Sequence, residues 1–278
     1  MGQPVFSYDY ESVRELLVSR NEPDGSPWSA RFARDGWLGP QQVTPRWLIR
    51  QAPEGLSPSD SIADGGFLLH LLDSLRQLRK IGTTLSGEDA GFGLLPARTR
   101  LEWTDGTRRF ELLLGAAADG GGRYARIGSE RLVVNGAALD MLQMMASFQK
   151  TRHQRLLTWT LDDADRVTIR WSSPAASWAA ERSTGEWTRP GTRGAGRFSR
   201  TPGDALEALA HLQVASFDLP NQDFGKPTIT LEWLDRNDHR LLVEVDSRLR
   251  ARSSDRPGAI FQLHPGAAGV LSRTRFPR

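Results

Sequence analysis

The chain has 278 residues, of which 38% are hydrophobic and 25% are charged. This composition is typical of a globular protein with one large domain or two small ones. No stretch reaches the ~18 consecutive apolar residues of a membrane span, and the start of the chain lacks the basic and apolar regions of a signal peptide. Because cysteine is absent, disulfides, thiolate nucleophiles and cysteine-bound zinc or iron–sulfur clusters are excluded.

The positive charge of the chain comes almost entirely from arginine. The formal net charge is +3 with 36 basic residues, of which only Lys80, Lys150 and Lys226 are lysines. The excess lies near the C-terminus, where Asp255 is the single acid among Arg248, Arg250, Arg252, Arg256, Arg273, Arg275 and Arg278. We expect a solvated basic terminus there. A nucleic-acid partner is not predicted, because such binding needs a contiguous basic face.

The first half of the chain predicts strands and two helices. In chain order they are a strand over Val13–Val18, a strand through Trp28, a turn at Asp35-Gly36 before Trp37, a leucine-striped helix (Leu68, Leu71, Leu72, Leu75, Leu78), a strand over Thr99–Trp103, a strand over Phe110–Leu114, strands at Tyr124–Ile127 and Leu132–Val134, and a helix from about Ala137 to Gln149. The helix stripe follows the 3.6-residue period. Between Leu38 and Ala63, the apolar Trp47–Ile49 is either an extra strand or a loop folded over the sheet.

The second half predicts the same elements in the same order. They are strands at Val167–Trp171 and through Trp178, a turn before Trp187, a helix capped by Thr201–Asp204 with Ala205, Leu209 and Leu212 as its stripe, strands at Ile229–Trp233 and Leu241–Val245, and a short strand and helix at Ile260–Leu263 and Pro265–Leu271. Apolar and polar residues alternate in the strands after each helix, which is typical of antiparallel sheets with one buried face.

Four landmarks recur in both halves and indicate a tandem duplication. They are Trp28/Trp37 against Trp178/Trp187, Phe92-Gly93 against Phe224-Gly225, Leu101–Trp103 against Leu231–Trp233, and the polar turn that follows each of these strands. We therefore predict an α+β protein of two tandem repeats, residues 1–157 and 158–278, each an antiparallel meander with helices packed on one face. No glycine- or serine-rich linker separates them, so tight packing is expected.

The first repeat resembles a family of bacterial proteins of unknown function, number four-three-four-zero in its catalogue. The matching motifs are Gly93-Leu94-Leu95-Pro96, Asp105-Gly106, Leu112–Gly115 and Tyr124-Ala125-Arg126. The resemblance is best over residues 10–175 and fainter to about 263. It implies a periplasmic or extracytoplasmic protein tethered to the inner membrane by one N-terminal helix, sometimes accompanying ABC transporters of the gliding-motility type. This chain lacks that helix, so its start is expected to follow the removed anchor.

Catalytic and cofactor motifs are not evident, and the family resemblance carries none over. No two histidines among His70, His153, His211, His239 and His264 have a metal-ligand spacing, and His70 and His211 are expected on the polar sides of their helices. Gly120–Gly122 is predicted to be a hairpin turn and Asp162–Asp165 a turn into the second repeat. Catalytic residues, cofactors and metals are therefore all predicted as none.

Tryptophan is the one unusual feature of the composition, with nine residues. Trp47, Trp159 and Trp171 have no partner in the repeat, and if exposed they would be the best anchors for a protein partner or a glycan. The sequence thus favours a non-enzymatic binding or accessory protein of a membrane transport or envelope assembly, with transporter subunits or another membrane protein as partner. The alternative is a carbohydrate-active or other hydrolytic enzyme with paired carboxylates ~5–9 Å apart between the repeats.

Overall fold

The computed structural model describes residues 2–21, 27–34, 46–52, 61–145, 148–172, 177–183, 186–188, 202–217, 219 and 224–274. The described residues divide into two compact units, with the division between His153 and Gln154. Each unit has a hydrophobic core of its own. None of the described helices is long and apolar enough to cross a membrane.

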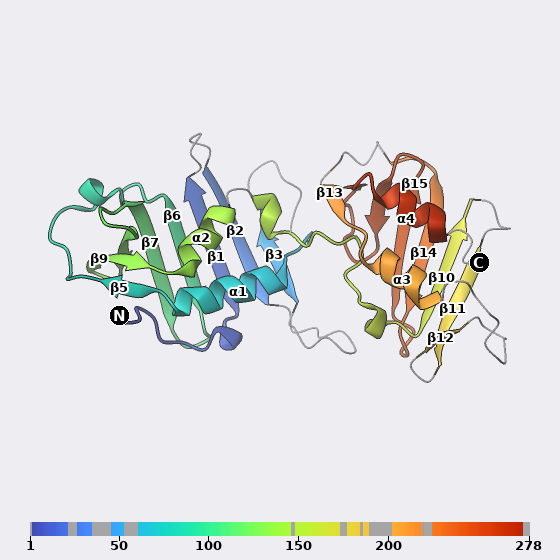
Figure 1. The fold of residues 1–278 in the computed structure, drawn as a ribbon, viewed down its shortest axis with the longest axis horizontal. Helices are drawn as coiled ribbons and strands as arrows, with labels where there is room; N and C mark the ends of the chain where they lie inside the picture. The colour runs from blue at the N-terminus through green and yellow to red at the C-terminus, as the bar shows by residue number, and fades with distance from the viewer. Residues whose placement is uncertain are drawn as a thin grey trace. The chain divides into compact units, whose positions relative to one another are not determined.

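The first unit contains one antiparallel sheet with two helices on one face (Figure 1). Its elements are η1 (Tyr10–Ser12), β1 (Glu15–Asn21), β2 (Pro27–Arg34), β3 (Trp47–Gln51), β4 (Ser61–Ile62), α1 (Gly65–Arg76), β5 (Arg79–Ile81), η2 (Asp89–Phe92), β6 (Thr99–Thr104), β7 (Arg109–Ala117), β8 (Arg123–Ile127), β9 (Glu130–Asn135), α2 (Ala137–Met144) and η3 (Phe148–Thr151). The strand order is β4-β3-β2-β1-β6-β7-β8-β9-β5. Residues 47–49 are therefore a strand, not a loop.

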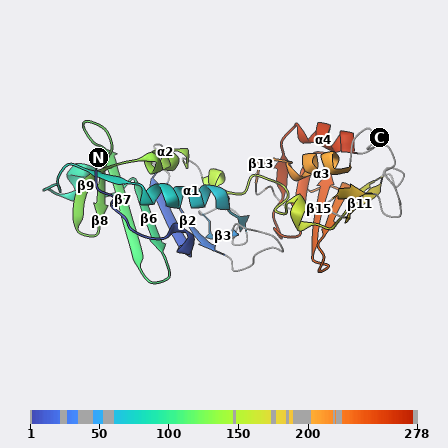
Figure 2. The same ribbon diagram turned by 60° about the horizontal axis from the view of Figure 1, so that its bottom comes forward.

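The second unit repeats this arrangement (Figure 2). Its elements are η4 (Leu161–Asp163), β10 (Arg166–Trp171), β11 (Trp178–Ser183), β12 (Glu186–Thr188), α3 (Pro202–Ala210), β13 (Val214–Ser216), β14 (Pro227–Leu234), β15 (Arg240–Asp246), β16 (Arg250–Ser253), β17 (Phe261–Leu263) and α4 (Ala267–Thr274). The order β12-β11-β10-β14-β15-β16-β17-β13 matches the first sheet strand for strand, apart from β4. The predicted fold class, two α+β repeats with helices on one sheet face, is confirmed.

Backbone hydrogen bonds show where each copy begins. The N–H of Lys80 on β5 donates to Gln3, and the N–H of Val214 on β13 donates to Gln154 in the same way. The next rungs match as well, with Val5 donating to Leu78 and Leu156 donating to Leu212. Each copy therefore starts with a short segment that covers one edge of its sheet, a common protection against edge-to-edge association. The second copy starts at Gln154.

Strand registers match the same positions in the two cores. Leu16 lies opposite Trp103 across β1 and β6, and Val167 lies opposite Trp233 across β10 and β14. The leucines of α1 form one buried stripe, and the Asp64 carboxylate caps this helix by accepting from the N–H of Phe67 at 2.9 Å. In α3 the stripe differs from the prediction, because Leu206 is buried where Ala205 is only half-buried.

The nine-residue spacing of tryptophans is wrong as a landmark of the repeat. Ala30 lies opposite Val18 on β1, whereas Trp178 lies opposite Ile169, the equivalent of Val18 on β10. Trp178 therefore corresponds to Ala30 and not to Trp28. In the same register Arg182 is the equivalent of Arg34. Trp187 lies opposite Arg182 and Trp47 lies opposite Arg34, so Trp187 corresponds to Trp47. Trp37 lies outside the described residues. Hairpin length sets the register, and spacing along one strand cannot reveal it.

The predicted solvated basic terminus is wrong for Arg256, which is buried, whereas Arg248, Arg252 and Arg273 are exposed as expected. Arg250–Ser253 forms β16 in the interior of the second sheet. Arg256 is only 4% exposed; its guanidinium donates to the carbonyl of Arg155 at 2.8 Å and lies 5.1 Å from the ring centroid of Phe261. Arginine can be buried in this way because its planar group stacks on an aromatic ring while it donates hydrogen bonds. Arg275 and Arg278 lie outside the described residues.

A glycine allows the connection between β5 and β6 to cross the first sheet. A Cβ atom at Gly115 on β7 would overlap the carbonyl oxygen of Phe92. Gly115→Ala is therefore expected to lower the free energy of unfolding by about 1–2 kcal/mol, the cost of overpacking. Gly91→Ala is the matched control, because a Cβ atom at Gly91 meets nothing within 4 Å. Chemical denaturation measures both, and equal effects of the two substitutions would contradict this explanation.

Candidate functional site

The three tryptophans predicted as partner anchors are buried. Trp47, Trp159 and Trp171 are 0%, 7% and 9% exposed, respectively. Trp47 lies on the core side of β3 and Trp171 lies on the core side of β10, since strand residues alternate between faces. Trp159 follows the start of the second copy as Tyr8 follows the start of the first, and both side chains belong to the cores. The condition of exposure is not met, so these residues are core residues and not surface anchors.

The titratable groups singled out in the sequence form local structural contacts. His70 and His211 are exposed on or next to their helices, as expected. His239 Nδ1 lies 2.8 Å from Asp235 Oδ2 at the tip of the β14–β15 hairpin, where the same carboxylate accepts from the N–H groups of Asn237 and His239. Burial raises the pKa of Asp235, but these donors outweigh it and the pKa is lowered. In the described part of the chain, no group of three His, Asp or Glu residues could hold a metal ion.

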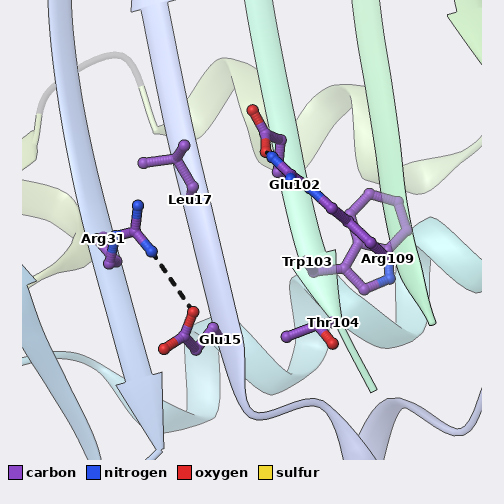
Figure 3. Close-up of a pocket in the computed structure, with 7 residues that line it drawn as sticks. All are labelled: Glu15, Leu17, Arg31, Glu102, Trp103, Thr104 and Arg109. Atoms are coloured by element: carbon purple, nitrogen blue, oxygen red, sulfur yellow. Dashed lines mark hydrogen bonds and ion pairs between the residues drawn. The ribbon is translucent and has the colours of Figure 1, made fainter. Parts of the chain in front are cut away.

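The face of each sheet opposite its helices, here called the open face, carries the charged residues. On the first sheet it contains a hollow of about 300 Å³, shown in Figure 3, which we call the Glu102 hollow. Its lining comes from four adjacent strands: Glu15, Leu17, Arg31, Glu102, Trp103, Thr104 and Arg109. The pleat directs alternate residues of β1 and β6 to this face, and Leu17 lies opposite Glu102 across them.

Glu102 is held between two arginines. Its side chain is only 10% exposed; Oε1 lies 2.7 Å from Arg100 Nη2, and Oε2 accepts a hydrogen bond from Arg109. Arg109 is 75% exposed in its side chain, and its hydrogen bond to Glu102, with the attraction between the charges, raises its pKa. On the other side of the hollow Arg31 Nη1 lies 3.5 Å from Glu15. Both oxygens of Glu102 are therefore engaged by guanidinium groups.

The second sheet retains the same ion pair at the equivalent positions. Glu232 lies opposite Thr168 as Glu102 lies opposite Leu17, and it contacts Arg240 at 2.7 Å and Arg170 at 3.0 Å. Arg240 matches Arg109. Arg109 precedes Phe110, which lies opposite Trp103, and Arg240 precedes Leu241, which lies opposite Trp233. The open-face positions around this pair differ, since Glu15, Leu17 and Arg31 of the first sheet correspond to Arg166, Thr168 and Ala179 of the second. The alternation of the sequence placed Glu102 and Glu232 on the outer face, and that signal could have singled them out.

This geometry does not suit glycoside hydrolysis. A pair of carboxylates for that reaction needs one oxygen free to donate a proton and another free to attack or to activate water. Both oxygens of Glu102 and of Glu232 are bound by arginine, so neither carboxylate has an oxygen left for these two roles. The hollow is also at the small end of the range of about 300–1,000 Å³ usual for ligand sites.

The fold and this site define a class of protein: an α+β chain with two tandem antiparallel-sheet units, each with a charged open face. Comparisons with protein-family models, with curated proteins and with solved structures found no match to this chain.

Proposed function

We propose that the protein is a non-enzymatic binding or accessory subunit that contacts its partner through the open face of the first sheet. The observation that carries the proposal is the Glu–Arg pair retained at equivalent positions in both copies, although neighbouring positions diverged. Glu102 and Glu232 are only 10% and 13% exposed in their side chains, so the arginines also neutralise nearly buried carboxylates, whereas Arg109 and Arg240 remain 75% and 51% exposed and present their guanidinium groups on the open face. Charged groups fixed in place favour specific and rapid association with a complementary surface.

The partner class and location rest on the family resemblance of the first repeat. It favours an extracytoplasmic protein beside the inner membrane, with a transporter or envelope-assembly subunit as partner. We keep both as part of the proposal.

Site-specific crosslinking in the organism that carries the gene tests this proposal. A photoreactive residue at Thr104, in the Glu102 hollow, is expected to capture one membrane protein reproducibly. The same residue at His70, exposed on α1 on the opposite face, is the matched control and is expected not to capture it. Equal capture at both positions, or none at Thr104 with the protein expressed and folded, would contradict the proposal.

A further inference from the structure

The second unit contains a hollow of about 350 Å³ on its open face, which we call the Arg252 hollow. Strands β15 and β16 form its floor, and the β16–β17 connection and Phe224 form its walls. Its apolar lining includes Leu242, Pro257, Ala259 and Ile260, and its charged groups include Glu244 and Arg252. Its volume, like that of the Glu102 hollow, lies at the lower end of the range usual for ligand sites, but its mixture of apolar walls with a few polar groups is typical of sites for small molecules.

Arg252 is held in one orientation by two neighbours. Its Nε lies 2.5 Å from Glu244 Oε2, and its guanidinium carbon lies 4.7 Å from the centroid of the Phe224 ring. The side chain remains 52% exposed. The terminal Nη1 and Nη2 atoms form no hydrogen bond with any residue in the described ranges. Two guanidinium donors are therefore fixed in place and available to a ligand.

The first copy shows which group occupies the equivalent position. Arg126 on β8 matches Arg252 on β16. The residue before each arginine shows this, because Ala125 lies opposite Leu114 and Ala251 lies opposite Val245, and Leu114 and Val245 occupy equivalent positions in the two sheets. Arg126 Nη1 donates to Asp89 Oδ2 at 2.7 Å, and the other oxygen of Asp89 accepts from Arg131 at 2.6 Å. The segment that crosses the first open face thus supplies a carboxylate to this arginine.

The second copy differs in the loop beside this position. In the first copy β8 and β9 are joined by a tight turn in which Ile127 lies opposite Glu130. In the second copy the connection from β16 to β17 is longer and is fixed at its ends, with Ser254 donating to Leu242 at 2.9 Å and Leu219 donating to Ile260 at 3.0 Å. This longer loop forms a wall where the first copy has none.

We propose that the Arg252 hollow binds a small carboxylic acid with a compact apolar body. The ligand carboxylate accepts hydrogen bonds from Nη1 and Nη2 of Arg252, and its apolar part contacts Leu242 and Ile260. In the first copy a carboxylate of the chain is bound at the equivalent arginine, where Asp89 accepts from Nη1 of Arg126. Guanidinium groups suit this role because their paired donors match the two oxygens of a carboxylate. The proposal does not depend on the partner contact at the Glu102 hollow.

Ligand-observed NMR with the full chain tests the proposal, with 4-methylpentanoate and benzoate as probes. The corresponding amides are the matched ligands without charge. The acids are expected to bind and the amides not, and Arg252→Gln is expected to weaken binding of the acids about tenfold, which corresponds to ~1.4 kcal/mol. Arg126→Gln is the control variant and is expected to leave binding unchanged, because Asp89 already occupies that arginine.

The other outcomes overturn the proposal. Equal binding of acids and amides would show that Arg252 does not recognise the charge, and equal weakening by Arg126→Gln and Arg252→Gln would remove the assignment to this hollow. Failure of both acids to bind the folded wild-type chain would reject the ligand class. Tighter binding of an acidic peptide than of either free acid would assign the hollow to a protein side chain.

Arg252→Lys keeps the charge without the paired donors and should bind the acids with intermediate affinity. Circular dichroism checks that each variant is folded.

Discussion

Trp233→Ala is expected to lower the free energy of unfolding of the second unit by about 3–5 kcal/mol, the usual cost of emptying a large aromatic site. Trp233 is 0% exposed and lies between Val167 and Leu241, which are opposite it on the two neighbouring strands. Its indole Nε1 is buried and makes no hydrogen bond within the described part of the chain. Trp233→Phe is therefore expected to cost much less, since it removes an unsatisfied donor and keeps most of the apolar volume.

Trp103→Ala provides the matched substitution in the first unit. Trp103 is 2% exposed and packs against Phe6 at 4.9 Å and Phe110 at 5.4 Å between ring centroids. Because the two cores have no residue in common, each substitution is expected to reduce amide protection mainly in its own sheet. Hydrogen exchange followed at the amides of β7 and β15 measures this. Equal loss of protection in both sheets from either substitution would show that the units unfold as one.

Asp246→Ala is expected to lower the free energy of unfolding of the second unit by about 3 kcal/mol, because several buried donors lose their acceptor. Asp246 is only 2% exposed. Its carboxylate accepts hydrogen bonds from the backbone N–H groups of Gly225 at 3.0 Å, Arg248 at 2.8 Å and Arg250 at 2.9 Å. These bonds join Gly225, which follows Phe224, to the turn between β15 and β16. Their loss is expected to loosen the Phe224 wall of the Arg252 hollow as well.

The effect of Asp246→Ala depends on pH. Burial alone raises the pKa of Asp246, but the three backbone donors outweigh it, so the folded pKa lies below the ordinary value. A carboxylate with a lowered folded pKa stabilises the fold above its unfolded pKa of about 3.9, and this contribution is lost as the pH falls through the folded pKa. The difference between wild type and Asp246→Ala, measured by urea denaturation, should be constant near neutral pH and shrink below about pH 4.

Asp119→Ala is the control for this substitution, because Asp119 is exposed in the β7–β8 turn. It is expected to change the free energy of unfolding by less than about 0.5 kcal/mol. A similar loss from both substitutions, or an Asp246→Ala effect that is unchanged at low pH, would contradict the role given to the buried carboxylate.

The sequence was sufficient for the features that depend on local periodicity. Alternation in Ile229–Trp233 and in Thr99–Trp103 predicted which side chains enter each core, because neighbouring residues of a strand face opposite sides. The leucine spacing of α1 predicted its buried stripe, and the recurrence of Phe-Gly and Leu-Glu-Trp predicted the duplication. The outward positions of Glu102 and Glu232 followed from the same alternation, so part of the candidate site could be read from the sequence.

Tertiary structure alone decided which distant residues meet. The correspondence of Trp178 with Ala30, the burial of Trp159 and Arg256, and the two arginines on Glu102 depend on strand register and on contacts between segments far apart in the chain. Arg126 and Arg252 occupy equivalent positions, yet Asp89 reaches the first, while the second borders a hollow beside a longer loop. The alternation of residues along a strand determines the face on which a side chain lies. The residue opposite it depends on how strands far apart in the chain pair, and no local sequence pattern reveals that pairing.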